Sequence, residues 1–335
     1  MRAIVVERPG VAALRRVPRP DPGRGEVLVR VGAAGICGSD VEVLEGRRPA
    51  RYVRYPIIPG HEWAGAVAAV GPGVENVEEG DTVVAEGFRA CGECARCREG
   101  RTNLCAADYA ETGFTHAGAF AEFLCVPAHL VHRLPPGTDV AAAALLEPAA
   151  CVAQGLLEVD LRPGMAAAVV GSGTLGLLAV ALLGRYGPAR LALVGTRPTR
   201  LELGRAMGAT ETWNVRQGQH AEPGFDFVFE ATGTVDGARS AVELARRGGT
   251  VVLEGISGQA GGIDADAVVL GHLRIQGVFG ASRNAWRWVT DLFAARLLDT
   301  EPLVSRSFPL EEHAAAFAAL TDRAGDALKV QLTPT

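Results

Sequence analysis

A short glycine-rich stretch near the middle of the chain constrains the fold more than any other feature. Residues 169–176 read VVGSGTLG and stand between an apolar run typical of a buried strand and an apolar run typical of a helix. In such a unit the first glycine makes a tight turn, the second lets a pyrophosphate approach the backbone, and the third lets the helix press on the strand. The stretch therefore predicts a dinucleotide site at a helix N-terminus, although a glycine-rich turn without a ligand is the alternative. The expected contact residues are Gly171, Gly173, Thr174, Leu175 and Gly176.

Around this stretch, apolar strands alternate with helical segments from about residue 164 onward. The expected strands are 166–170, 191–194, 225–230, 250–253 and 274–278, and the expected helices are 175–186, 200–207 and 235–246. Strict alternation of strand and helix is typical of βαβ units, whose strands run parallel. The fold class is therefore α/β, with a doubly wound parallel sheet in this part of the chain.

The first part of the chain, up to residue 147, follows a different pattern. Short runs rich in β-branched residues, broken by glycine and proline, predict a β-rich domain with long loops. Its expected strands are 26–31, 64–70, 81–85 and 120–126. After Gly280 the chain has amphipathic stretches at 284–298 and 310–320 and a closing strand at 329–332, which together are too short for a domain of their own. We expect domains at 1–147 and 148–283, with 284–335 completing the first.

Charge and hydropathy exclude several classes of function. The chain has 335 residues and a net charge of −5, with no excess of basic residues that would hold nucleic acid. No charge-free apolar run reaches the roughly 18 residues needed to cross a bilayer, and the first residues are too quickly charged for a signal peptide. We expect a cytoplasmic protein that binds a small molecule, without a nucleic-acid or membrane partner.

Four of the seven cysteines stand within fifteen residues, with the spacing C-x2-C-x2-C-x7-C. They are Cys91, Cys94, Cys97 and Cys105, in a lobe at about 88–108. Four thiolates suit a closed tetrahedral zinc site. A pair of disulfides is the alternative, but it is typical of secreted chains. The lobe therefore predicts a structural zinc, and catalysis must be sought elsewhere.

The end of the second strand of the dinucleotide unit indicates which nicotinamide cofactor binds. An acidic residue is expected there when NAD is the ligand, because it bonds the ribose 2′-OH. Residues 193–200 read LVGTRPTR and contain no acid. Gly195 leaves room for a 2′-phosphate, and Thr196 and Arg197 offer it donors, with Arg200 as a second candidate. NADP is favoured, unless the arginines are only solvated residues at a helix start.

Outside the cysteine lobe, possible metal ligands occur at Cys37, at His61 and Glu62, and at Glu147. A catalytic zinc keeps one position open and uses mixed N, S and O ligands, which this set provides. The ligands are far apart in the sequence, and isolated cysteines and histidines are usually core or surface residues. Spacing alone does not establish this site.

These segments together carry a resemblance to a known family. GICGSD from Gly35, GHE from Gly60, the four-cysteine lobe, EP at Glu147 and GxGxxG at Gly171 occur in one order. In this the chain resembles the medium-chain zinc-dependent alcohol dehydrogenases, over nearly its whole length. The resemblance implies a GroES-like catalytic domain, a Rossmann cofactor domain, and homodimers or homotetramers. It also implies that the four-cysteine lobe is a structural site.

The resemblance also implies roles for individual residues. Cys37 and His61 would be ligands of the catalytic zinc, with Glu62 bound directly or exchanging with Glu147. Ser39 would pass the substrate proton towards solvent. Asp40 would orient His61 or merely cap a helix. Where many relatives carry a histidine three residues after the relay hydroxyl, this chain has Glu42, which puts the outer end of the proton path in doubt.

Further residues would lie near the cofactor by the same resemblance. Thr232, Gly255 and Phe279 stand in strand-end turns whose small residues would admit the nicotinamide, although each turn also suits an ordinary strand end. Lys329 resembles a basic residue that touches the cofactor phosphates. A single lysine near the C-terminus is more often a surface charge.

The expected reaction is hydride transfer between NADP(H) and an alcohol or carbonyl compound. The GHE and EP segments resemble the polyol, sugar, cyclitol and threonine dehydrogenase branches, so a hydroxylated substrate is expected. Arginines in the loop 46–55 would bind an anionic group or, more often for such loops, remain solvated. A zinc-free quinone or enoyl reductase and a non-catalytic NADPH-binding protein are the alternatives.

Overall fold

The computed structural model describes residues 1–259, 261, 263–322 and 325–334. The chain divides into two compact units. The first unit combines Met1–Ala150 with Gly280–Thr335, and the second unit is Cys151–Phe279. The divisions fall after Ala150 and after Phe279, rather than after residues 147 and 283, where the sequence pattern placed them.

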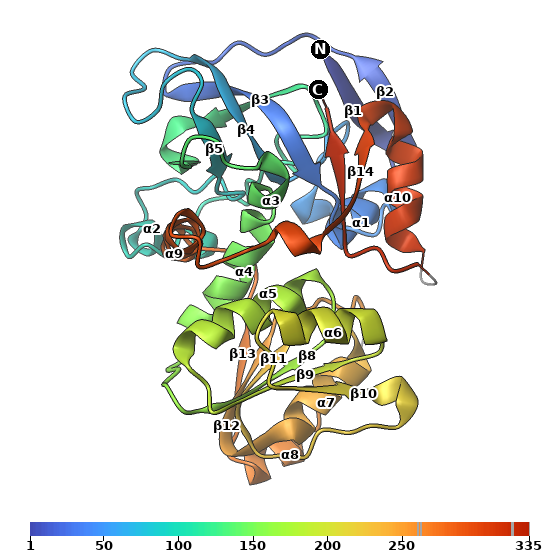
Figure 1. Ribbon diagram of the computed structural model, residues 1–335. Coiled ribbons are helices and arrows are strands. Elements are labelled where there is room, and N and C mark those ends of the chain that lie inside the picture. The colour runs from blue at the N-terminus through green and yellow to red at the C-terminus, as the bar shows by residue number, and fades with distance from the viewer. Residues whose placement is uncertain (260, 262, 323–324, 335) are drawn as a thin grey trace. The chain divides into compact units, whose positions relative to one another are not determined.

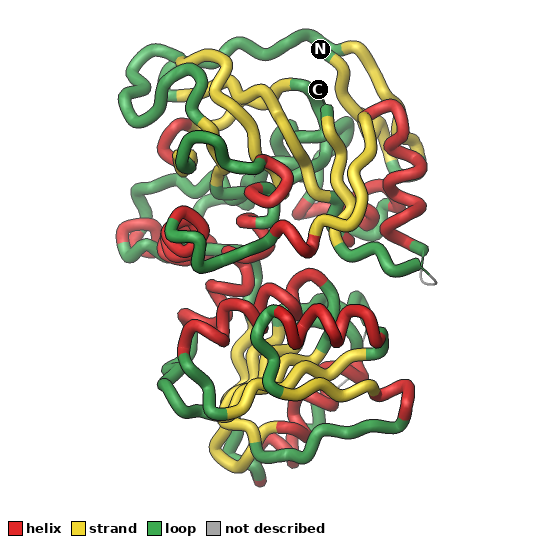
Figure 2. Tube along the Cα trace, viewed as in Figure 1, coloured by secondary structure: helices red, strands yellow, loops and turns green. Residues whose placement is uncertain are grey.

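The second unit is a parallel six-stranded sheet in the order β10-β9-β8-β11-β12-β13. Its strands are β8 (Ala166–Val170), β9 (Arg190–Gly195), β10 (Glu211–Asn214), β11 (Phe225–Glu230), β12 (Ala245–Leu253) and β13 (Arg274–Gly277). Its helices are α5 (Thr174–Leu183), α6 (Pro198–Ala206), α7 (Val235–Leu244) and α8 (Ala265–Leu270). The order reverses beside β8, as in a dinucleotide-binding fold. Figures 1 and 2 show α5 and α6 on one face of this sheet and α7 and α8 on the other.

Two short elements of the second unit were not expected from the sequence, namely β10 and α8. The run ETWN of β10 is only partly buried, and it pairs with one neighbour at the edge of the sheet. Neither the alternation nor the continuous apolar run that marks a strand is present there. Helix α8 has six residues and none of them is buried, so the run ADAVVL is too short to show a helical period.

The first unit contains a two-stranded ribbon and a larger sheet. The ribbon consists of β1 (Arg2–Arg8) and β2 (Val11–Arg16). The larger sheet has the order β14-β15-β3-β4-β5-β7, with β6 paired to β3. Its strands are β3 (Glu26–Gly35), β4 (Glu62–Val70), β5 (Thr82–Ala85), β6 (Phe123–Pro127), β7 (Val131–Arg133), β14 (Val304–Pro309) and β15 (Lys329–Thr333). The C-terminal strands thus belong to this sheet, and Figure 1 shows β14 and α10 in the same unit as the N-terminal strands β1 and β2.

The strand register in this sheet brings the residues of the candidate site close together. On β3, Gly35 lies opposite Glu62 of β4 on one side and Gln331 of β15 on the other. Three segments that are distant in the sequence therefore meet at the end of β3. An added Cβ at Gly35 would lie 2.3 Å from Glu62 Oε2, so glycine is needed for this close approach.

The helices of the first unit are short, apart from α4 and α9. They are α1 (Gly38–Glu45), α2 (Ala95–Arg98), α3 (Val140–Ala143), α4 (Leu146–Leu157), α9 (Arg283–Ala294) and α10 (His313–Thr321), of which α4 continues into the second unit. One segment in the described part of the chain, Val140–Leu157, is long and apolar enough to cross a membrane by composition. It contains Glu147, and 72% of it is buried, which is typical of a core helix.

Candidate active site

Local structure brings Cys37, His61 and Glu62 together. Cys37 precedes α1 as its N-cap residue, just beyond the end of β3, and His61 precedes β4, which begins at Glu62. Because β3 and β4 pair antiparallel, the end of one strand lies beside the start of the other. One ligand atom from each of these three side chains lies within 4.8 Å of the other two. The first unit therefore presents the mixed S, N and O donor set of a metal site.

Asp40 caps a helix, as one of the two readings of the sequence predicted, and it also lies beside His61. Its Oδ2 accepts the backbone N–H of Cys37 at 2.8 Å, which closes a capping box at the start of α1. Its Oδ1 accepts the backbone N–H of Gly60 at 3.2 Å and lies 3.4 Å from His61 Nδ1. The fully buried carboxylate therefore fixes the segments that carry Cys37 and His61, and it lies next to Nδ1 of the histidine ring.

Lys329 lies in this site, and its reading from the sequence as a surface charge is wrong. The side chain is buried rather than exposed, and its Nζ bonds Glu62 at 2.8 Å to Oε1 and 2.5 Å to Oε2. It also donates to the carbonyl oxygen of Ile36 at 3.4 Å. A lysine held in this way balances the charge of Glu62 within the first unit.

The electrostatics of the site favour a bound cation. Burial opposes a charged imidazole, yet the carboxylate of Asp40 and the neighbouring Cys37 and Glu147 hold the pKa of His61 well above its usual value. Burial likewise opposes a charged lysine, yet Glu62, Cys37 and Glu147 keep the pKa of Lys329 raised. A site that stabilises positive charge on buried bases suits a divalent metal ion.

The remaining residues expected at this site are distributed around it. Ser39 Oγ lies 3.5 Å from His61 Nε2, beside the donor set. Glu147 acts on the site electrostatically but is not among the three residues whose ligand atoms converge. Glu42 faces arginines, with Oε2 lying 3.6 Å from Arg48 Nη1.

The four cysteines of the lobe form the second candidate metal site. Cys91, Cys94, Cys97 and Cys105 offer sulfur atoms that converge in one cluster. Cys91 Sγ and Cys97 Sγ lie 3.9 Å apart, close to the roughly 3.8 Å edge of a tetrahedron with zinc–sulfur bonds of about 2.3 Å. All seven cysteines are free, so the disulfide alternative is wrong.

Backbone groups of the lobe prepare its sulfurs for metal binding. The N–H groups of Cys94 and Ala106 donate to Cys91 Sγ at 3.4 Å and to Cys94 Sγ at 3.5 Å. Backbone hydrogen bonds, chiefly from Ala106, lower the pKa of Cys94 to about 6, because they stabilise the thiolate. A deprotonated thiol is the form that binds zinc.

The second unit carries the expected dinucleotide features at the carboxyl end of β8. Gly171 has φ +115, and an added Cβ at Gly176 would lie 1.8 Å from the backbone oxygen of Gly171, so both positions require glycine. At Gly173, the N-cap of α5, an added Cβ would meet no atom within 4 Å, and no side chain caps the helix. The turn therefore leaves open space at a helix N-terminus, as a pyrophosphate requires.

The residues expected near the adenosine ribose follow β9. Gly195 ends this strand, and an added Cβ would lie 2.4 Å from Ser172 Oγ of the glycine-rich turn. A side chain at this position would therefore require Ser172 to move. Thr196 and Arg197 come next, with Arg197 as the N-cap of α6, and Arg200 lies within that helix.

The other residues expected near the nicotinamide end adjacent strands. Thr232 donates to Glu230 at the end of β11. An added Cβ at Gly255, beyond β12, would lie 2.1 Å from the backbone nitrogen of Gly233, so two strand-end turns pack directly on each other. Phe279 follows β13 and is partly exposed.

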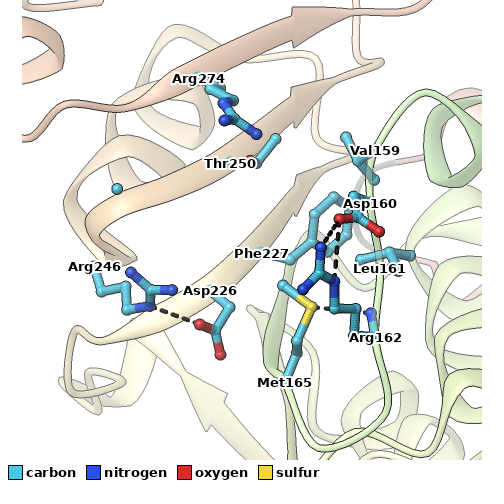
Figure 3. A pocket seen from close by; sticks show the side chains of 11 residues that line it. Val159, Asp160, Leu161, Arg162, Met165, Asp226, Phe227, Arg246, Thr250 and Arg274 are labelled. Carbon is cyan, nitrogen blue, oxygen red and sulfur yellow. Dashed lines mark hydrogen bonds and ion pairs between the residues drawn. The ribbon is translucent and has the colours of Figure 1, made fainter.

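A pocket of about 290 Å³ in the second unit lies away from these features (Figure 3). Its lining includes residues at or just before the starts of β8, β11 and β13, among them Met165, Asp226 and Arg274. Dinucleotides bind at the carboxyl ends of such strands. Two of its arginines, Arg246 and Arg162, form ion pairs with aspartates, as the dashed lines in Figure 3 show. This pocket is therefore not the dinucleotide site.

Sequence reasoning missed one buried polar cluster of the first unit. The side chain of Arg48 is only 7% exposed, so the solvated reading of the loop arginines is wrong at this position, whereas Arg47 is 59% exposed. Arg48 lies with Tyr109 and Glu111, a segment in which no motif appears.

A doubly wound cofactor-type domain, a β-rich domain with a Cys–His–Glu site and a four-cysteine lobe define a zinc-dependent dehydrogenase. Comparisons with known proteins agree. Residues 23–136 match the alcohol dehydrogenase GroES-like domain, and residues 174–295 match the zinc-binding dehydrogenase domain. The chain belongs to the zinc-dependent medium-chain alcohol dehydrogenase family, and is therefore an oxidoreductase.

Individual relatives match over nearly the whole chain. L-threonine 3-dehydrogenase of Bacillus subtilis is 33% identical, covering 96% of this chain and 95% of its own length. Sorbitol dehydrogenase of the same organism is 31% identical, covering 100% and 97%. The solved structure of a zinc-binding dehydrogenase from Sinorhizobium meliloti, bound to NADP, has a TM-score of 0.92 at 30% identity and covers 99% of both chains.

Proposed function

We propose that this protein is an NADP(H)-linked alcohol dehydrogenase that acts on a secondary alcohol or ketone, and that its substrate is a polyol, sugar, amino sugar or cyclitol. The observation that carries the proposal is the convergence of Cys37, His61 and Glu62, with the hydroxyl of Ser39 3.5 Å from the histidine. Relatives named for threonine and sorbitol support hydroxylated substrates.

The side chains of the first unit would bind the metal ion and transfer the proton. Cys37, His61 and Glu62 would hold zinc, with Glu147 available to exchange with Glu62 as the resting ligand. When bound there, zinc supplies the Lewis acidity that favours loss of the hydroxyl proton. Ser39 would accept that proton and pass it outward. Hydride would move between the substrate carbon and the nicotinamide, whose position the second unit would set.

Supporting residues would keep these groups in place. Asp40 would hold His61 in one orientation through the contact at Nδ1 and would fix the start of α1. Lys329 would neutralise Glu62 whenever that carboxylate is not engaged by the metal. Glu42 would not continue a proton path as a histidine does, because its carboxylate faces Arg48.

Replacing Arg197 with alanine is expected to raise KM for NADP+ by roughly 10-fold or more, with little change for NAD+, because a charge-assisted contact to the 2′-phosphate is lost. Arg197 follows Gly195 and Thr196 at the end of β9, where the acid typical of NAD binding is absent. Arg205→Ala, an exposed arginine near the end of the same helix, is the matched control. Equal changes for the two cofactors would remove Arg197 from the 2′-phosphate site.

Replacing Gly173 with alanine is expected to weaken NADPH binding by roughly 10-fold or more without changing the thermal midpoint by more than about 2 °C. The backbone there has φ −85, which alanine tolerates, and its Cβ would occupy only the open space assigned to the pyrophosphate. Gly184→Ala, equally uncrowded at the other end of α5, is the control. NADPH affinity that is unchanged in the Gly173 variant, measured by fluorescence titration, contradicts the assignment.

The proposed function is tested by a substrate screen. Polyols, sugars, amino sugars, cyclitols and hydroxy amino acids would be offered with NADP+ and with NAD+, and NADPH formation followed by absorbance. The second candidate function is a threonine-type hydroxy amino acid dehydrogenase, which the similarity to the B. subtilis threonine enzyme supports. A preference for L-threonine or a related hydroxy amino acid would establish it. Active protein without zinc would indicate a quinone or enoyl reductase. Absence of turnover with intact NADPH binding would indicate a binding protein.

Two further expectations accompany this function. A homodimer or homotetramer and a cytoplasmic location stay predictions.

A further inference from the structure

The buried guanidinium of Arg48 carries an inference about the substrate. Arg48 follows α1 on the loop after Gly46, and its side chain is only 7% exposed. Burying a charged arginine is costly unless its donors are bonded. Within the described residues, its only hydrogen bond runs from Nη2 to the hydroxyl of Tyr109, at 3.3 Å. Its Nε is buried and has no partner there.

The two carboxylates near Arg48 lie beyond hydrogen-bond distance. Glu42 Oε2 is 3.6 Å from Nη1, and Glu111 Oε2 is 3.9 Å from Nη2. Glu111 is itself buried and accepts a hydrogen bond from Tyr109. The guanidinium is thus neutralised by its neighbours, but most of its five donors remain available for another oxygen.

This group lies close to the candidate metal site. Arg48 Cζ is 4.1 Å from the centre of the Phe114 ring, and the same ring centre is 4.8 Å from the centre of the His61 ring. The distance from the guanidinium to His61 therefore cannot exceed the sum of these two separations. Glu111 also lies near enough to interact electrostatically with His61 and Glu147. A chain of a few carbons is long enough to span this separation.

The charge around Arg48 discriminates between the ligands that an arginine binds. Besides Glu42, the carboxylates of Asp40 and Glu147 act on this region. A further carboxylate or phosphate would meet more negative than positive charge there. Burial raises the pKa of Glu111 to about 8, so near neutral pH this carboxyl both donates and accepts. Donors and acceptors side by side suit a neutral hydroxyl group.

Resting on the proposed function, we propose that Arg48, supported by Tyr109 and Glu111, binds a second hydroxyl of the substrate, one or two carbons from the reacting carbon. The enzyme then selects diols and polyols over simple alcohols and over hydroxy acids. A site built to bond a hydroxyl strongly rejects the analogue that lacks it, because its own polar groups are left unpaired. Arg48 is thus a specificity-determining residue.

The experiment compares substrates that differ by one hydroxyl, namely cyclohexanol, cyclohexane-1,2-diol and cyclohexane-1,3-diol, together with L-threonine. Wild-type enzyme is expected to prefer the better diol to cyclohexanol by roughly 100-fold in kcat/KM. Arg48→Met should reduce this ratio to below about 5-fold while changing the value for cyclohexanol less than about 3-fold. Arg51→Met is the matched control, since Arg51 is an exposed arginine of the same loop that lies over the Tyr52 ring.

A second variant keeps the proposal testable if the Arg48 variant does not fold. A second measurement keeps it testable if the proposed function is wrong. Glu111→Met keeps a similar side-chain volume but removes both polar oxygens, and it should lower diol preference by roughly 10-fold. Calorimetric titration of diol into each enzyme saturated with NADPH measures binding without turnover. The titration therefore tests the role of Arg48 even if the enzyme oxidises none of these alcohols. A lack of oxidation would count against the proposed function and not against the role of Arg48.

Each remaining outcome decides the proposal. Equal losses for cyclohexanol and diol would mean that Arg48 has a structural role and would overturn it. Unchanged diol binding by both variants would overturn it as well. A selective loss for L-threonine, with diols unaffected, would overturn it in favour of carboxylate recognition.

Discussion

Replacing Cys37 with alanine is expected to lower kcat by roughly 1,000-fold or more, because the variant loses one of three converging ligands and with it the Lewis acidity at the site. Binding of NADPH should change less than about 3-fold, since the glycine-rich turn belongs to the second unit. Metal analysis should show one zinc fewer per chain. Steady-state kinetics, a fluorescence titration and zinc determination on the same sample check the three expectations.

The matched control for this variant is Cys125→Ala, a free cysteine on β6 outside both metal clusters. Its side chain makes no contact with either cluster in the described part of the chain, so zinc content and kcat should stay near wild type. Full activity in the Cys37 variant would refute the catalytic zinc assignment. Loss of NADPH binding together with activity would show that Cys37 acts on the whole fold.

Replacing Cys97 with alanine is expected to lower the stability of the protein while leaving kcat nearly unchanged. Cys97 is the most buried of the four lobe cysteines, and structural zinc contributes on the order of 10 kcal/mol to folding in small zinc domains. The thermal midpoint should fall by roughly 10 °C or more, with one zinc lost per chain. The kcat of the protein that stays folded should change less than about 3-fold, because the lobe supplies no group to the Cys37, His61 and Glu62 site.

Differential scanning fluorimetry at matched protein concentration, with zinc determination before heating, checks this expectation. Cys125→Ala again serves as the control. Unchanged stability after loss of one zinc would mean that the lobe folds without its metal. Loss of both zincs in the Cys97 variant would mean that the two sites are not independent.

Much of the fold was predictable because its determinants are local. The alternation of apolar strands and helices after residue 164 requires only periodicity, and it predicted the parallel sheet that the structure has. The glycine-rich turn was predictable for the same reason, since Gly171 and Gly176 fulfil steric demands within one strand–turn–helix unit. The edge strand β10 and the helix α8 were not, because both are short and neither buries a continuous apolar face.

The candidate site was predictable only in part. Cys37, His61 and Glu62 stand in short motifs whose order resembles a family, so a single sequence was enough to single them out. Lys329 and Arg48 stand in no motif. Their burial follows from strand pairing and loop packing, which join positions as distant as Lys329 and Glu62.

The sequence by itself determined the four-cysteine lobe, the glycine-rich turn and the donor types of the candidate active site, because each depends on residue identity within a few positions. Only the tertiary structure decided that β15 would carry Lys329 to Glu62 and that Arg48 would be buried beside Tyr109 and Glu111. The physical reason is that the free energy of a charge depends on its surroundings. A lysine or arginine side chain is well solvated in water, but in a protein interior its charge must be compensated by neighbouring carboxylates.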